Sequence, residues 1–259
     1  MGKKRNKAKA AEVAIVEPEL IQELTDRAKD LTSDDPTEAR IAEQPVVETP
    51  QDFDTMLASV SVEAVQAKVD ATCSALRERS DFEAIKDPEN KKIQKTIDSV
   101  WKQITTHRAA RLMCAVNFDP ETLNRVIHEG ARYNVYAMGK LSDAIWGLTN
   151  SEDGKRGQIT NAINLACMRS LFRFRADGTQ FTSEMAKAAA SDKIRVDAKV
   201  RELLVRHTVS ASTAPTQASS TMQALESLGI VRRSGSGKNP NFDLTANPIV
   251  AALKKALAA

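Results

Sequence analysis

The feature that most constrains the fold of this 259-residue chain is a helical repeat of apolar residues through its middle. Between residues 55 and 176, apolar side chains recur at three- and four-residue steps, the spacing that places them on one face of a helix. One such face carries Val62, Val65, Val69, Cys73 and Leu76, and a longer one carries Ile93, Ile97, Val100, Trp101, Ile104 and Leu112. The sequence therefore predicts a mainly α fold with a helical bundle over 55–178.

Residues that typically start or end helices divide the second half of this region, from Asp119 to Gly178, into separate predicted helices. Asp119-Pro120-Glu121 combines an N-cap, a first-turn proline and an acid near the positive end of the helix dipole, so we expect a helix from there to Gly130. Two more helices are marked by apolar stripes, which are Met138, Leu141, Ile145 and Leu148, and then Ile159, Ile163, Cys167 and Leu171. The polar loop 151–157 separates these two helices, and Asp177-Gly178 ends the second.

The first 54 residues differ in composition from the bundle. Residues 1–10 are basic, and 32–54 are rich in Asp, Glu, Thr and Pro, so neither segment buries enough apolar surface to offset its chain entropy. We therefore predict a disordered arm over 1–54. Apolar residues at helical spacing indicate a short helix over 19–31 inside it, and its face from Leu20 to Leu31 is either a contact for a protein partner or part of a transient helix.

Composition excludes several classes of protein. No run of about 18 apolar residues is present and the N-terminus lacks a signal peptide, so we expect no membrane contact and a cytoplasmic location, in a bacterial or phage-infected cell or in a virion. The three cysteines form no CxxC pair, which predicts reduced thiols and no zinc ribbon. Aromatic residues make up only 4% of the chain, which argues against a stacking platform for single-stranded nucleic acid.

The pattern changes in the C-terminal third. An apolar stripe predicts a helix over about 192–207, and a second helix over about 215–228 ends at Gly229. Two short strand-like segments follow around a Gly/Ser loop, which predicts a β-hairpin over 230–244. A last helix over 248–257 either closes this module or forms a dimer interface.

The stretch from Thr216 to Val231 ends in Leu225-Glu226-Ser227-Leu228-Gly229-Ile230-Val231. A polar helix start, then Leu-x-x-Leu-Gly-Ile and a basic hairpin, resembles the recognition helix and wing entry of winged helix-turn-helix proteins. The resemblance covers about 181–257 and implies a winged-helix-like domain over 179–259 with duplex DNA as its partner. No family is identified for the rest of the chain.

The resemblance and the helix geometry together assign the side chains that would contact DNA. These are Thr216, Gln217, Ser219, Ser220 and Gln223 on the recognition helix, and Arg232, Arg233 and Lys238 on the wing. We expect the polar helix residues to face outward, where Gln can bond an adenine edge and Ser or Thr can bond bases or phosphates. The wing cations would neutralise phosphates, and residues 181–259 hold 11 basic and 6 acidic residues in all.

A second basic cluster lies at the end of the predicted bundle. It consists of Arg169, Arg173 and Arg175 with Phe172 and Phe174 between them, preceded by Lys155-Arg156 in a loop. This cluster either extends a DNA-binding surface toward the wing or forms a solvated helix face over buried phenylalanines.

No motif predicts a catalytic, cofactor or metal site. His128-Glu129 begins like a zincin motif, but Arg132 stands where the second histidine is required. His107 and Cys114 lie two helical turns apart without further ligands at useful spacing. The loop 235–238 lacks the glycine and hydroxyl positions of a phosphate-binding P-loop.

Two functions from different classes fit these observations. The first is a non-enzymatic DNA-binding protein, regulatory or genome-associated, in which the bundle provides homo-oligomer or partner contacts. The alternative is a structural or assembly protein, of a tailed phage for example, whose winged module contacts protein.

Overall fold

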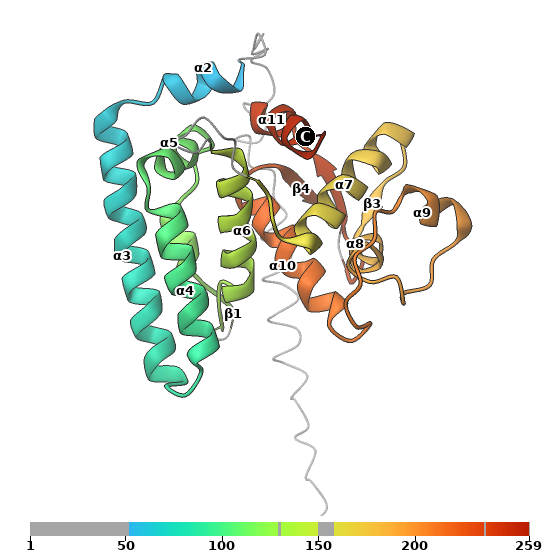
Figure 1. Ribbon diagram of the computed structural model, residues 1–259, viewed down its shortest axis with the longest axis horizontal. Helices are drawn as coiled ribbons and strands as arrows, with labels where there is room; N and C mark the ends of the chain where they lie inside the picture. The colour runs from blue at the N-terminus through green and yellow to red at the C-terminus, as the bar shows by residue number, and fades with distance from the viewer. Residues whose placement is uncertain (1–51, 129–130, 150–157, 236, 259) are drawn as a thin grey trace, which may run out of the picture. The chain divides into compact units, whose positions relative to one another are not determined.

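The computed structural model describes residues 52–128, 131–149, 158–235 and 237–258. Helices dominate these residues, with a few short antiparallel strands, so the expected mainly α fold is confirmed (Figure 1). The described residues form one compact unit. The basic arm, the helix expected over 19–31 and Lys155-Arg156 lie outside the described residues. No described helix is long and apolar enough to cross a membrane.

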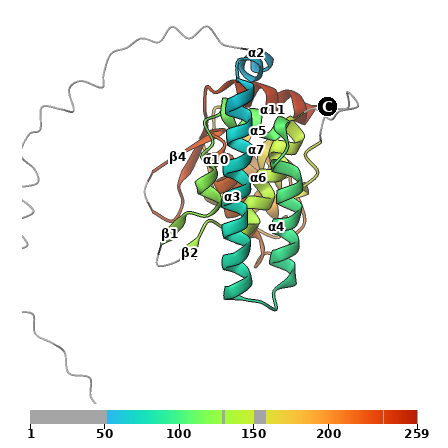
Figure 2. The same cartoon turned by 90° about the vertical axis from the view of Figure 1, so that its left-hand side faces the viewer.

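The first helices in the chain are α2 (Phe53–Ala58), α3 (Val62–Lys86), α4 (Lys91–Ile104) and α5 (His107–Ala115). α3 and α4 pack together as a long hairpin of helices (Figure 2). Two expectations are wrong here. The apolar face expected to run unbroken to Leu112 is divided between α4 and α5, because the Thr106 side chain accepts a hydrogen bond from the Ala109 amide and starts a new helix. Val62, expected in the core, is 70% exposed.

The helix expected from Pro120 to Gly130 is also wrong. Asp119 accepts a hydrogen bond from the Glu121 amide as expected, but only a 3-10 turn (η2, Pro120–Leu123) follows. The chain then forms a short antiparallel hairpin of β1 (Val126–His128) and β2 (Ala131–Arg132). The β-branched residues at 126 and 127 favour this extended backbone over a helix.

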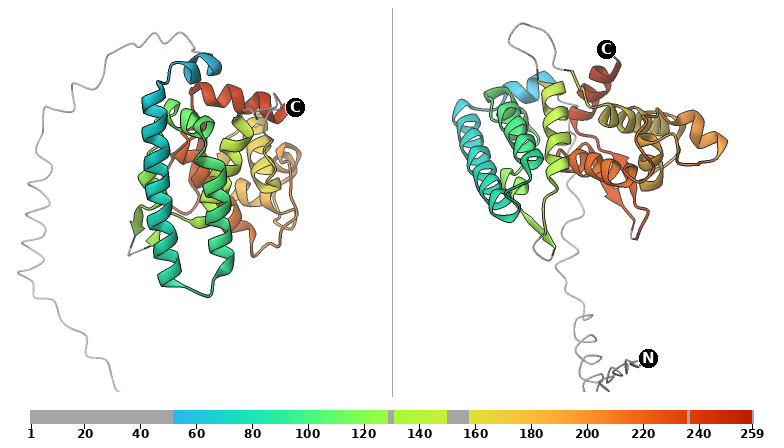
Figure 3. Two further views of the ribbon diagram at one scale, coloured as in Figure 1. Left: turned by 60° about the vertical axis from the view of Figure 1, so that its left-hand side comes forward. Right: turned by 60° about the horizontal axis from the view of Figure 1, so that its bottom comes forward.

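α6 (Val135–Leu148) is the central helix of the fold. It packs against α4 and α10, and α5 and α11 also contact it (Figure 3). All but three of its residues are buried, as expected for a helix that is apolar on most of its circumference. The exceptions are Tyr136, Gly139 and Trp146.

The remaining elements are α7 (Ala162–Asp177), β3 (Phe181–Thr182), α8 (Ser183–Ala190), α9 (Ala198–Leu203), α10 (Ala214–Ser227), β4 (Val231–Ser234), β5 (Asn241–Leu244) and α11 (Pro248–Ala258). The three strands form one antiparallel sheet in the order β3-β5-β4. The helices expected over 159–177, 215–228 and 248–257 and the hairpin over 230–244 are confirmed. α7 packs against α8, β3, β5 and α10, which all follow the boundary expected near residue 178, so these contacts cross that boundary.

The helix expected over 192–207 is wrong in extent, because only α9 is helical there. The segment after α9 instead runs extended along α8, where the His207 and Val209 amides donate to the carbonyls of Ala189 and Ala190. α8 was not expected from the sequence. Its buried residues are alanines, which carry too little apolar bulk to mark a stripe.

Candidate nucleic-acid interface

The hairpin β4–β5 carries the predicted wing cations. Arg232, Arg233 and Lys238 are all exposed. The register pairs Arg232 with Asp243 and Arg233 with Phe242. Because successive residues of a strand point to opposite faces, the two arginines lie on opposite faces of the hairpin. A DNA backbone that lies along one face of the hairpin would therefore contact only one of these arginines. A DNA groove whose edges reach both faces would contact both.

The loop end of this hairpin, just before β5, is fixed to the start of α8. The Asn239 side-chain oxygen accepts a hydrogen bond from the Glu184 amide at 2.9 Å, and the Pro240 carbonyl accepts one from the Ser183 amide at 3.0 Å. At the other side, Gly229 takes a φ of +65°, which a residue with a side chain rarely adopts. These contacts hold the hairpin in one direction relative to α8 and α10.

α10 presents a narrower polar surface than the sequence predicts. Thr216 and Ser219 are exposed, and Gln217 and Gln223 are half-buried. The expectation that Ser220 faces outward is wrong, because it is fully buried and its hydroxyl accepts a hydrogen bond from Asn134 Nδ2 at 3.3 Å. α6 covers this side of α10.

A buried polar network joins α6, α7 and α10. Asn164 Nδ2 donates to Asp143 Oδ2 at 2.8 Å, and Asn164 Oδ1 accepts from the Thr221 hydroxyl at 3.0 Å. Lys140 Nζ donates to Asn161 Oδ1 at 2.6 Å, and burial lowers the pKa of Lys140 to about 8. The network fixes α10 on α6. The sequence contains no signal for it, because its members are spread from residue 140 to 221.

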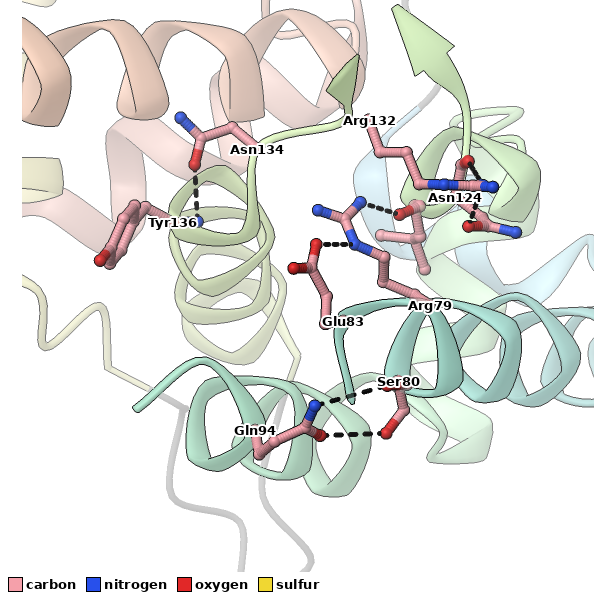
Figure 4. A network of polar contacts seen from close by, with 9 residues as sticks. Arg79, Ser80, Glu83, Gln94, Asn124, Arg132, Asn134 and Tyr136 are labelled. Carbon is pink, nitrogen blue, oxygen red and sulfur yellow. Dashed lines mark hydrogen bonds and ion pairs between the residues drawn. The ribbon is translucent and has the colours of Figure 1, made fainter. Parts of the chain in front are cut away.

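A second network holds the β1–β2 hairpin against α3 (Figure 4). Arg79 Nε pairs with Glu83 Oε1 at 2.8 Å, and a terminal nitrogen of Arg79 donates to the Leu123 carbonyl at 3.0 Å. Arg132 donates to the Asn124 carbonyl at 2.6 Å and lies over the Phe82 ring. Burial lowers the pKa of Arg79. Arg132 Nε is buried without a hydrogen-bond partner among the described residues, whereas Arg79, Glu83 and the terminal nitrogen of Arg132 are paired, so the network is a structural joint.

The basic cluster on α7 is exposed, whereas Phe174 is buried and packs edge-to-face on Phe181 with ring centres 5.3 Å apart. Arg169 donates to the Leu257 carbonyl of α11. Arg175 lines a cavity of about 80 Å³ beside Asp243. Ligand sites usually measure about 300 Å³ or more, so this cavity is too small to hold a nucleotide.

Within the described ranges, no group of three or more His, Cys, Asp or Glu side chains is placed to hold a metal ion. His107 Nε2 lies 3.3 Å from Gln66 Oε1, and Cys114 Sγ donates to the Ala64 carbonyl. Burial raises the pKa of the Cys167 thiol to about 12. This thiol is therefore neutral and a poor nucleophile near pH 7.

No protein-family model matches this chain, and no curated protein or solved structure matches it.

Proposed function

We propose that this protein is a non-enzymatic duplex-DNA-binding protein that contacts phosphates through the hairpin β4–β5. The observation that carries the proposal is the order α7-β3-α8-α10-β4-β5 with sheet order β3-β5-β4. Helices followed by an exposed basic hairpin are what the winged helix-turn-helix resemblance predicts. In this interpretation the winged-helix module begins with α7. The long segment that contains α9 separates α8 from α10.

The available side chains favour contacts to phosphates over contacts to bases. Arg232, Arg233 and Lys238 supply three exposed cations, which bind any sequence. On α10, Thr216 and Ser219 remain open to a base edge, and neither gives the bidentate contact by which Arg reads guanine. We therefore expect weak sequence preference.

The test is fluorescence anisotropy of a labelled random duplex with the full-length protein across a salt series. We expect Arg232→Glu/Arg233→Glu to weaken binding at least about 10-fold and to lower the slope of log Kd against log salt by about 2, because each lost phosphate contact removes about 0.9. Lys254→Glu/Lys255→Glu, an exposed pair on α11, is the matched control and should change neither value. Absence of binding by the unaltered protein at about 50 mM salt would refute the proposal.

A second candidate function, assembly through protein contacts, is favoured by one observation. α6 packs along α10 and buries Ser220, which leaves an exposed stripe with Thr216, Ser219 and Glu226 and no Arg or Lys. A helix flanked in this way does not enter a major groove freely. Large, salt-resistant homo-oligomers in light scattering, without duplex affinity, would support this function, of which a tailed-phage structural protein is one example.

A further inference from the structure

The outer face of α4 is strongly basic. Four of its exposed side chains are lysines, namely Lys91, Lys92, Lys95 and Lys102, and its one exposed acid is Asp98. None of these lysines forms an ion pair with another described residue. The apolar face of α4 is used in the core, where Ile97, Val100 and Ile104 are buried. The basic face is therefore free for an anionic partner.

The neighbouring helix α6 exposes two aromatic rings on one stripe. Tyr136 is 39% exposed and Trp146 is 41% exposed. They lie ten residues apart, which is about 15 Å along a helix, and Gly139 lies between them on the same face. Figure 4 shows the Tyr136 ring pointing away from the arginine network. Large aromatic rings left this exposed on an otherwise buried helix are available to a ligand.

Two contacts bring the basic face and the aromatic stripe together. A Cβ atom at Gly139 would lie 3.6 Å from Thr96 Cγ2, and Ser142 donates a hydrogen bond to Gln103. These contacts occur in the same order along both helices, so α4 and α6 run alongside each other (Figure 1). Lys92 lies one turn before Thr96, and Tyr136 lies one turn before Gly139. Lys92 therefore lies level with Tyr136, and Lys95 and Lys102 continue along the same exposed face of α4.

We infer that Lys92, Lys95, Lys102, Tyr136 and Trp146, together called the α4–α6 surface, bind single-stranded nucleic acid. Unpaired bases stack on exposed aromatic rings, and lysines bind the phosphates between them. Bases in a duplex are already stacked on one another, so a duplex cannot use the two rings. Single-stranded sites span about 4 to 16 nucleotides, which is enough to reach both rings. This site is separate from the hairpin β4–β5 and does not depend on the proposed duplex binding.

The experiment measures anisotropy of fluorescein-labelled (dT)15 with the full-length protein at about 50 mM salt. We expect Tyr136→Ala/Trp146→Ala to weaken (dT)15 binding at least about 25-fold, since two stacking contacts are lost and each costs about 5- to 150-fold. Lys92→Ala/Lys95→Ala/Lys102→Ala should lower the slope of log Kd against log salt by about 2, because a single-strand phosphate contact contributes about 0.7. Trp146→Phe should retain most of the affinity.

Two controls separate this site from the hairpin. Lys254→Ala/Lys255→Ala and Arg232→Glu/Arg233→Glu should leave (dT)15 binding unchanged. Circular dichroism checks that every variant is folded, which we expect because the altered side chains are exposed. The inference is overturned if (dT)15 does not bind, or if the lysine variant weakens binding while the aromatic variant does not. If (dT)15 does not bind and the aromatic variant dissociates an oligomer seen by light scattering, the two rings are a protein contact instead.

Discussion

At the scale of single residues, the buried ammonium of Lys140 makes stability depend on pH. Its pKa is lowered from 10.5 to about 8, so between these values the unfolded chain holds a proton that the native protein has lost. The free energy of unfolding should therefore rise with pH, by about 2 kcal/mol between pH 7.5 and 10. Urea unfolding at several pH values measures this rise.

Lys140→Met should remove the pH-dependent rise and increase stability at pH 7.5. The Asn161 oxygen still accepts hydrogen bonds from the amides of Ile163 and Asn164, so the substitution leaves no unpaired acceptor. Lys254→Met, an exposed lysine on α11, is the control and should keep the rise. An equal rise in Lys140→Met and the unaltered protein would contradict the lowered pKa.

Two glycines of α6 should respond in opposite directions to the same substitution. A Cβ at Gly147 would clash with the Ile159 side chain and lie 2.8 Å from the Ile159 amide nitrogen, so Gly147→Ala should destabilise by about 1–3 kcal/mol. At Gly139 the nearest atom is at ordinary contact distance, and alanine favours a helix by about 1 kcal/mol. Gly139→Ala should therefore stabilise. Thermal unfolding of both variants gives the two signs, and a loss of stability in Gly139→Ala would show that α4 packs more tightly than described.

At the scale of elements, the joint between α3 and the 3-10 turn η2 depends on one carboxylate. Glu83 is 5% exposed and pairs with the buried Arg79. Glu83→Ala leaves that guanidinium uncompensated and should lower the free energy of unfolding by about 3–5 kcal/mol. Asp81→Ala, an exposed acid on the same helix, should have an effect below about 0.5 kcal/mol. Chemical denaturation compares them, and equal effects would rule out a stabilising joint.

At the scale of the whole molecule, the C-terminal module should not fold from residue 179 onward. α7 supplies Phe174, which packs on Phe181, and α6 covers one side of α10. A fragment 179–259 loses both partners, so we expect it to lack a cooperative thermal transition in circular dichroism. The full-length chain should unfold cooperatively. A cooperative transition in the fragment would instead support the domain boundary expected near 178.

Local signals in the sequence were enough to predict most elements. The Asp119 side chain caps the Glu121 amide as the sequence indicates, and Gly178 ends α7 in a left-handed conformation. These helix-end features depend on residues within one helical turn of each other. They can therefore be predicted from the sequence without knowledge of the tertiary structure. The hairpin β4–β5 was predicted for the same reason, from short strands around a Gly/Ser loop.

The errors arose where distant contacts decide the structure. Residues 204–207 were expected to continue a helix, but this segment runs along α8, and Ser220 has a polar side chain that α6 buries. The low aromatic content argued against a stacking surface, yet the fold exposes Tyr136 and Trp146 on one stripe beside the lysines of α4. The amino-acid sequence by itself determined several of the helices, the end of α7 at Gly178 and the basic hairpin, because these depend on local propensity. Only the tertiary structure decided which polar and aromatic side chains face solvent, because burial depends on residues far away in the chain.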